Sequence, residues 1–171
     1  MSELSGDWNR IDEILNPAKI AEGMRQAAAR VGNYGASEVK KGIVSGSPGG
    51  KTFKPNSPLT IARKGSSKPL IDKGDLVGSI TYQIIDSDNV FIGVKKGKEA
   101  NIAAVHEFGC TIKVTPKMRA YLHYQGVHLK PSTQMIYIPA RPFLRPVLDS
   151  SDFRAKVAEI YIQAIERIFH K

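Results

Sequence analysis

The sequence predicts a single α+β domain over residues 1–171, in which a small antiparallel sheet packs against a long N-terminal helix and a C-terminal helix, with a long extended basic loop. Three observations predict this class. Apolar residues recur at helical spacing near both ends of the chain, β-branched and aromatic runs lie between them, and a Gly- and Pro-rich stretch covers residues 46–69. At this length, folding buries roughly 70% of the surface of the unfolded chain, which is enough for a core.

The first long helix is predicted to begin at Pro17. Asn16 can cap it, and proline suits the first helical position because its missing N–H costs nothing there. Apolar residues follow at helical spacing, namely Ile20, Met24, Ala27, Val31, Val39 and Ile43. Gly32 and Gly35 interrupt this pattern and predict a kink or a close contact, because each costs about 1 kcal/mol relative to alanine in a helix. A shorter amphipathic segment precedes the cap, with Trp8, Ile11, Ile14 and Leu15.

Residues 46–69 form the segment that we call the basic arm. Its prolines and glycines leave little room for regular structure, and only the stretch from Pro58 to Gly65 is expected to make a helical turn. A loop this long inside a compact domain is generally functional or disordered. We therefore expect the arm to be flexible.

The centre of the chain predicts four strands and three short helices. Residues 79–85 and 90–94 form a hairpin around the turn at 86–89, and residues 110–114 and 134–138 are two further strands. Short helices are expected over residues 72–78 with Asp72 as the cap, over residues 101–108 with Gly109 as the terminator, and from Thr115 and Pro116 to Tyr124.

A C-terminal helix is predicted to start at Ser150 or Ser151, either of which can cap it. One face carries an apolar stripe of Phe153, Val157, Ile160, Ala164 and Ile168. The opposite face carries Arg154, Lys156, Glu159, Glu166 and Arg167. This pattern is typical of a helix that packs on a core with one face only.

Positive charge is concentrated in two regions. The whole chain has 25 Lys and Arg residues against 16 Asp and Glu, for a net charge of +9. Residues 40–73 hold eight basic residues and one acid, and residues 108–148 hold six basic residues and no acid. Such regions attract polyanions and acidic protein faces over roughly 8 Å at physiological salt. A solubilising surface explains the charge alone equally well.

The composition excludes several classes of protein. Cys110 stands alone, so an intrachain disulfide and a zinc site of several thiolates are both excluded. The longest apolar runs have only a few residues, which excludes a transmembrane helix, and the polar, acidic N-terminus is unlike a signal peptide. We therefore expect a soluble protein that folds in the cytosol and does not enter a membrane.

No segment predicts an active site, a cofactor or a metal. Residues 46–52 resemble a phosphate-binding loop, but the glycine spacing is one residue short and a helix precedes it. The four histidines lack metal-ligand spacing on a shared face, and His106-Glu107 does not continue as a zinc motif. Cys110 is interpreted as a small buried hydrophobe, and Asp72 and Asp75 as residues that serve local structure. We expect a protein that is not an enzyme.

Three short motifs occur in a fixed order along the chain. The first, in residues 68–80, contains Leu70, Asp72, Gly74 and Leu76; the second is His106, Glu107, Phe108 and Gly109; the third is Pro139, Ala140, Arg141, Pro142 and Phe143. This succession resembles the phage virion morphogenesis (tail completion) family of tailed bacteriophages, which is related to minor tail and neck proteins. The similarity covers roughly residues 15–170. Lys73 departs from the pattern, because threonine is expected between the aspartate and the glycine.

The resemblance implies a structural component of the virion, without catalysis, that completes the tail or joins it to the head. It implies a place in the tail or neck after assembly in the host cytoplasm. Family members are similar in forming rings, typically hexamers, around the channel through which DNA passes. The implied partners are further copies of the chain, neighbouring neck, connector or tail-tube proteins, and genomic DNA in non-specific contact.

The basic arm and the proline-rich residues 138–146 are the predicted contact surfaces. An arm that orders on meeting a neighbour loses its entropy at the assembly step. Phe143 and Leu144 can insert into a neighbouring core, and Arg141 can pair with a carboxylate such as Glu107. A rigid connector between the last strand and the last helix explains the same segment equally well. The predicted interface residues are Lys51, Phe53, Lys54, Pro58, Leu59, Arg63, Lys64, Arg141, Phe143 and Leu144, and those predicted to face DNA are Lys51, Lys54, Arg63, Lys64 and Lys68.

A free-standing basic nucleic-acid-binding protein is the alternative function. The charge of the basic arm favours it, but Phe53 is the one aromatic residue of the arm, so base stacking is poorly supplied. Within the phage interpretation, the sequence leaves open whether the chain is a tail terminator or a neck adaptor.

Overall fold

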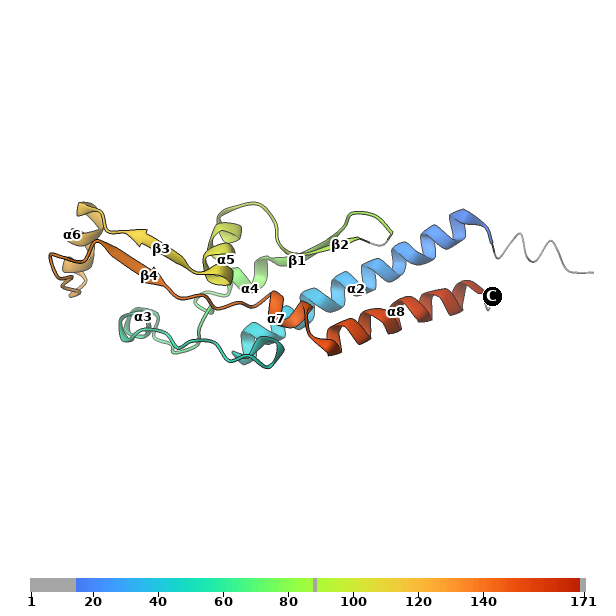
Figure 1. Cartoon of the computed structure of the whole chain (residues 1–171), viewed down its shortest axis with the longest axis horizontal. Coiled ribbons are helices and arrows are strands. Elements are labelled where there is room, and N and C mark those ends of the chain that lie inside the picture. Colours follow the sequence, from blue (N-terminus) through green and yellow to red (C-terminus); the bar gives the residue numbers. More distant parts are fainter. Residues whose placement is uncertain (1–14, 88, 170–171) are drawn as a thin grey trace, which may run out of the picture.

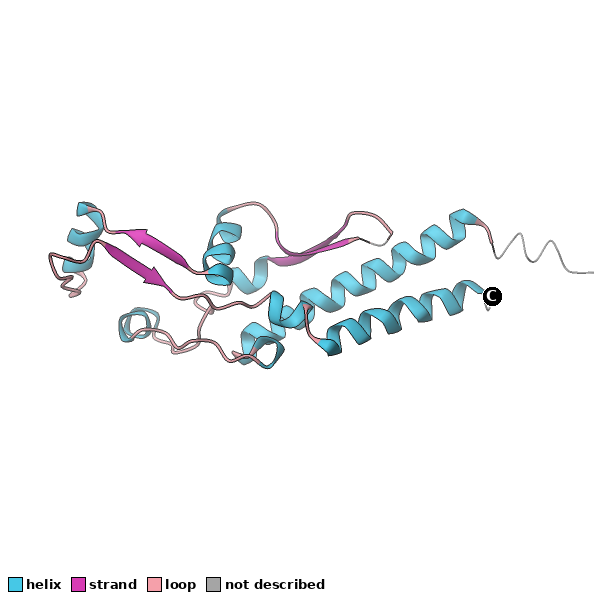
Figure 2. Cartoon of the chain, viewed as in Figure 1, coloured by secondary structure: helices cyan, strands magenta, loops and turns pink. Residues whose placement is uncertain are grey.

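The computed structural model describes residues 15–87 and 89–169. The molecule is elongated, with two long helices at one end and a strand-containing lobe at the other (Figure 1). Helices occur along the whole described chain, and the short strands lie between α4 and α7, as Figure 2 shows. The expected α+β class is therefore confirmed.

Helix α2 (Pro17–Ser45) begins and ends where local chemistry predicts. The side chain of Asn16 accepts the backbone N–H of Ala18 at 2.9 Å, and Gly46 ends the helix in the left-handed region with φ 78°. One face of α2 is buried, and its buried residues are Ala27, Ala28, Val31, Gly32, Gly35, Ala36, Val39, Gly42 and Ile43. Of the amphipathic segment predicted before this helix, Trp8, Ile11 and Ile14 lie outside the described residues.

The first sheet lies directly on α2. Strands β1 (Ile80–Ile84) and β2 (Val90–Val94) are antiparallel, with Tyr82 opposite Ile92. A Cβ on Gly32 would collide with the Tyr82 ring, and one on Gly35 would collide with Ile92. Because Gly32 and Gly35 lack side chains, the hairpin can approach the backbone of α2 closely. Of the kink and the close contact that were the alternatives, the structure shows the close contact.

Helix α8 (Ser151–Phe169) runs antiparallel to α2 (Figure 1). The hydroxyl of Ser150 accepts the N–H of Phe153 at 3.2 Å, so Ser150 is the cap. Ile160 and Ala164 are buried against Ala27 and Val31 of α2, which confirms the packing face predicted for this helix.

The main core lies where α2 meets the middle of the chain. It joins residues from α2, from α4 (Asp75–Ser79), α5 (Lys98–Phe108) and α7 (Arg145–Leu148), and from the basic arm. Its buried side chains are Ala36, Val39, Ile43, Phe53, Leu76, Ile80, Ala103, Phe143 and Val147.

The expected cap at Asp72 is wrong. Helix α4 begins at Asp75, and its N-cap is Gly74, which has φ 90° and makes no side-chain cap hydrogen bond. A left-handed backbone at this position favours glycine over any residue with a side chain. The turn therefore depends on the conformational freedom of Gly74, and Asp72 is exposed two residues before it.

The remaining strands form a second sheet of their own. Strands β3 (Cys110–Lys113) and β4 (Met135–Ile138) pair only with each other, antiparallel, with Ile112 opposite Ile136. Helix α6 (Pro116–Tyr124) connects them, and the hydroxyl of Thr115 caps it through the N–H of Met118 at 3.2 Å. The expected single sheet is thus two separate two-stranded sheets.

The basic arm has more structure than its composition predicts. It contains the 3₁₀ turn η1 (Pro48–Gly50) and helix α3 (Pro58–Lys64), which Ser57 caps and Gly65 ends. The side-chain amide of Asn56 donates to the carbonyl oxygens of Ser67 and Lys68, both at 3.2 Å, so the arm closes on itself. The expected helical turn is confirmed by α3, and the flexibility of the arm stays a prediction.

Candidate subunit interface

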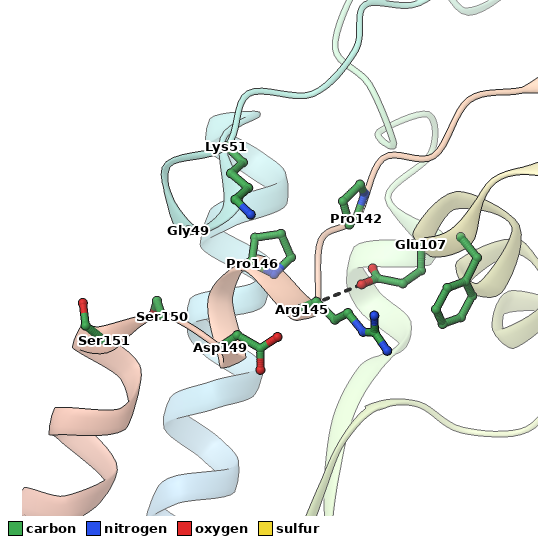
Figure 3. Close-up of a pocket in the computed structure, with 10 residues that line it drawn as sticks. Gly49, Lys51, Glu107, Pro142, Arg145, Pro146, Asp149, Ser150 and Ser151 are labelled. Atoms are coloured by element: carbon green, nitrogen blue, oxygen red, sulfur yellow. Dashed lines mark hydrogen bonds between the residues drawn. The ribbon is translucent and has the colours of Figure 1, made fainter.

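Glu107 organises the junction between α5, α7 and the proline-rich residues 138–146. It lies in the last turn of α5 and is buried. One carboxylate oxygen accepts the N–H groups of Phe143 at 2.8 Å and Leu144 at 3.1 Å. The other accepts the N–H of Arg145 at 3.1 Å, which is the hydrogen bond drawn in Figure 3. A buried carboxylate is stable here because three backbone donors satisfy it, and it in turn caps the start of α7.

Arg141 ties the basic arm to the same junction. Its guanidinium donates to the carbonyl oxygens of Lys54 and Pro55, both at 2.8 Å, and its backbone N–H donates to the carbonyl of His106 at 2.6 Å. Burial lowers the pKa of Arg141. The expected pairing of Arg141 with Glu107 is wrong, because each of these charged groups is satisfied by backbone atoms instead.

His106 precedes Glu107 in α5, and its carbonyl oxygen accepts the backbone N–H of Arg141. Its Nδ1 is buried and has no hydrogen-bond partner. Burial lowers the pKa of His106, and the positive charges of Arg141 and Lys64 lower it further. The imidazole is therefore held in its neutral form near neutral pH.

Three of the predicted interface residues belong to the interior of the chain. Phe53 and Phe143 lie in the main core, and Arg141 is buried against the arm. This corrects the expectation that they insert into or bind a neighbour, because a ring in the chain's own core is not part of its surface. Leu144 is half-buried and packs against the same core.

Other predicted arm residues do lie at the surface. Helix α3 has no buried residue, and the exposed predicted residues of the arm are Lys51, Lys54, Pro58, Leu59, Arg63 and Lys68. Lys64 is half-buried, and its ammonium donates to the carbonyl oxygen of Lys68 at 2.8 Å. Their contact with a neighbouring subunit or with DNA stays a prediction.

Several family-motif residues lie in the main core or at the Glu107 junction. Leu76 is buried in the core, Leu70 packs against it, and Gly109 ends α5 with φ 76°. Pro139, Ala140 and Pro142 lie between β4 and α7, in the segment that Glu107 and Arg141 fix. These motif residues therefore stabilise the fold of the chain itself. Among the motif residues of α5, Phe108 is the one with an exposed side chain.

A second candidate surface, which the sequence interpretation missed, is the distal lobe formed by residues 110–138. Val114 is its one buried residue, whereas Tyr124 is 86% exposed, Tyr137 is 64% exposed and Met135 is 55% exposed. The guanidinium of Arg119 donates to the carbonyl oxygens of Leu129, Lys130 and Thr133 and holds the lobe together.

The unbroken apolar run of β4 is the signal that points to this surface. Met135 and Tyr137 are exposed, while Ile136 and Ile138 are half-buried on the other face. A strand that is apolar on both faces is typical of one that is covered on both faces. In the part of the chain that the structure describes, the face of that strand with Met135 and Tyr137 is uncovered.

An open pocket of about 670 Å³ lies beside the Glu107 junction (Figure 3). Its lining mixes Lys51 and Arg145 with Asp149 and two prolines. The guanidinium of Arg145 lies over the ring of Phe108, 5.9 Å from its centroid. Glu107 also lines the pocket, but both of its oxygens already accept backbone hydrogen bonds.

Two further findings concern metal ions and membranes. Among residues 15–87 and 89–169, no three His, Cys, Asp or Glu side chains gather in a group that could hold a metal ion. In the same described part of the chain, no helix is both long and apolar enough to cross a membrane.

Comparison with known proteins identifies the family. No curated protein and no solved structure matches the chain. The model of the phage virion morphogenesis family matches residues 7–166, which is nearly the whole chain and includes all three motifs. The match therefore spans the core, the Glu107 junction and the distal lobe, and the chain belongs to the phage virion morphogenesis family.

Proposed function

We propose that the chain is a tail-completion or head–tail joining subunit, without catalytic activity, that assembles as a ring around the DNA channel. The distal lobe is the observation that carries this proposal. A two-stranded sheet is at best marginally stable in water without a covered apolar face. The lobe has one buried residue and exposes Tyr124, Met135 and Tyr137, so a neighbouring subunit is expected to cover it.

The shape of the molecule suits a head-to-tail contact. The distal lobe and the α2–α8 pair lie at opposite ends of an elongated chain (Figure 1). A ring forms when one surface of each copy binds a different surface of the next copy and the rotation closes. The lobe carries Lys113, Lys117, Arg119 and Lys130 and no acid, so an acidic receiving surface is expected on the neighbour. A hexamer, next to neck, connector or tail-tube proteins, is the family expectation.

The basic arm is proposed to face the DNA. Lys51, Lys54, Arg63 and Lys68 are exposed, and none of them forms a salt bridge among the described residues. Attraction to phosphate needs no base contact and suits a channel through which any sequence must pass. A free-standing nucleic-acid-binding protein uses the same charges, so DNA binding alone does not separate the two functions.

A pair of charge substitutions tests the assembly. Tyr137 is 64% exposed in the lobe, and Ile85 is 68% exposed in the turn after β1, so Tyr137→Glu and Ile85→Glu each place a carboxylate at a surface apolar site. We expect sedimentation analysis to find rings for the wild type and for Ile85→Glu, and folded monomers for Tyr137→Glu. Monomers in all three samples, with tight and strongly salt-dependent DNA binding, would favour the alternative function.

A further inference from the structure

Helix α8 carries a second apolar stripe on the side that faces away from α2. Its members are exposed and follow each other at spacings of three, four, three and four residues: Ala155, Ala158, Ile162, Ile165 and Phe169. Ile162 is 55% exposed, although the other face of the same helix already packs on α2 through Ile160 and Ala164. The helix is therefore apolar on two faces, and one of them is uncovered within residues 15–87 and 89–169.

This spacing is that of the contact positions in a coiled coil. Alternating steps of three and four residues keep the apolar side chains on one seam when two helices wind around each other. Among residues 15–87 and 89–169, no side chain covers the isoleucines of this stripe, although α8 already has one apolar face packed on α2.

We propose that this stripe docks onto the same stripe of a second copy, with the two α8 helices parallel. The charges beside the stripe favour this occupant and this orientation. In a parallel pair, Arg154 of one copy faces Glu159 of the other, because the flanking positions five residues apart meet. In an antiparallel pair, Glu159 faces Glu166 and the two repel each other. The inference rests on the proposed function for its choice of a second copy as the partner. Because this contact joins identical surfaces, it is separate from the head-to-tail contacts of the ring and links a subunit of one ring to a subunit of another.

The groups that would form the new ion pair are available. Glu159 accepts from Lys156 at 2.8 Å, and the two side chains are 48% and 42% exposed, so exchanging this partner for Arg154 of another copy costs little. Arg154 lies 3.9 Å from Asp149 in an exposed pair. The stripe spans two heptads, fewer than the three or four that mark a free-standing coiled coil. We therefore expect pairing that depends on protein concentration.

Disulfide trapping tests the orientation. In a Cys110→Ser background, which removes the one native thiol, Ala155→Cys and Phe169→Cys place thiols at the two ends of the stripe. A parallel pair predicts that each variant crosslinks with itself under mild oxidation. An antiparallel pair predicts a crosslink only when the two variants are mixed. Arg167→Cys, which is exposed but lies off the stripe, is the matched control and should not form a disulfide crosslink.

Two results would overturn the inference. One is a crosslink that forms only in the mixture, and the other is no more dimer from Ala155→Cys and Phe169→Cys than from the control. If residues 1–14 or another protein cover the stripe, the stripe is not free to pair, and the experiment gives this second result.

Ile162→Glu separates this inference from the proposed function. If the pairing of α8 contributes to assembly, Ile162→Glu lowers the dimer yield in the Ala155→Cys background at least tenfold while the chain stays folded. Rings that form from the Ala155→Cys chain with Ile162 intact, but without an α8 crosslink, would reject the α8 pair and leave the ring in place. A wild-type chain that remains monomeric at every concentration, without crosslinks, would reject both.

Discussion

Glu107 and Arg141 show how two charges of opposite sign are buried in one junction without pairing with each other. The carboxylate accepts three backbone N–H groups, and the guanidinium donates to two backbone carbonyls. The sequence predicted that Arg141 pairs with Glu107, because residue types show only which charges are present. They do not show which backbone groups a distant segment brings near, and here those groups lie more than 30 residues away in the chain.

Substitution of Glu107 is expected to destabilise the fold strongly. Glu107→Ala leaves three N–H groups without their acceptor, and each buried donor without a partner costs about 1–3 kcal/mol. Glu107→Gln keeps the shape but turns an amide N–H₂ toward those donors, so we expect an intermediate loss. Chemical denaturation measures both. Glu166→Gln, an exposed change of the same kind on α8, should leave the free energy of unfolding within about 0.5 kcal/mol of wild type.

His106 predicts a dependence of stability on pH. Its pKa is lowered in the folded chain by burial and by Arg141 and Lys64, so the unfolded chain takes up the proton more readily. The free energy of unfolding should therefore fall as the pH drops through about 6.5, the ordinary histidine pKa. Denaturation at pH 7.5 and at pH 5.5 measures the change in the free energy of unfolding. In His106→Gln, this change should be smaller by the contribution of the histidine. An equal difference in both proteins would assign the effect to other groups.

Local signals predicted the helices well. Asn16 and Pro17 mark the start of α2, Thr115 and Pro116 mark that of α6, and Ser150 caps α8, all as expected. These signals succeed because a cap and its donor lie within a few residues of each other. The basic arm resisted prediction for the opposite reason. Its order depends on Phe53 in the core and on Arg141, which reaches Lys54 from 87 residues away.

Two glycines of the short helix α4 should respond to alanine in opposite directions. Gly74 has φ 90° and no atom near the site of a Cβ, so Gly74→Ala costs backbone strain alone, about 1–2 kcal/mol. Gly78 lies inside α4 with equally open space and no positive φ, so Gly78→Ala should gain up to about 1 kcal/mol. Thermal or chemical denaturation of both variants measures these shifts. Equal effects would contradict the assignment of Gly74 as the left-handed cap.

At the scale of the whole molecule, the sequence predicted the strands but not how they are divided into sheets. The first hairpin is local, and its turn at residues 86–89 reveals it. Strands β3 and β4 are separated by α6 and its following loop, so their pairing is not encoded in a turn. The resulting lobe has little core of its own, and this property appears only when burial is known.

The central claim is that a second copy covers the distal lobe in a closed ring. An electron-microscopy reconstruction of the purified wild-type chain at high concentration tests it most directly. We expect a ring in which residues 110–138 of each copy contact the next copy, with the exposed lysines of the basic arm toward the central channel. A reconstruction in which Tyr124, Met135 and Tyr137 of every copy face solvent would contradict the claim.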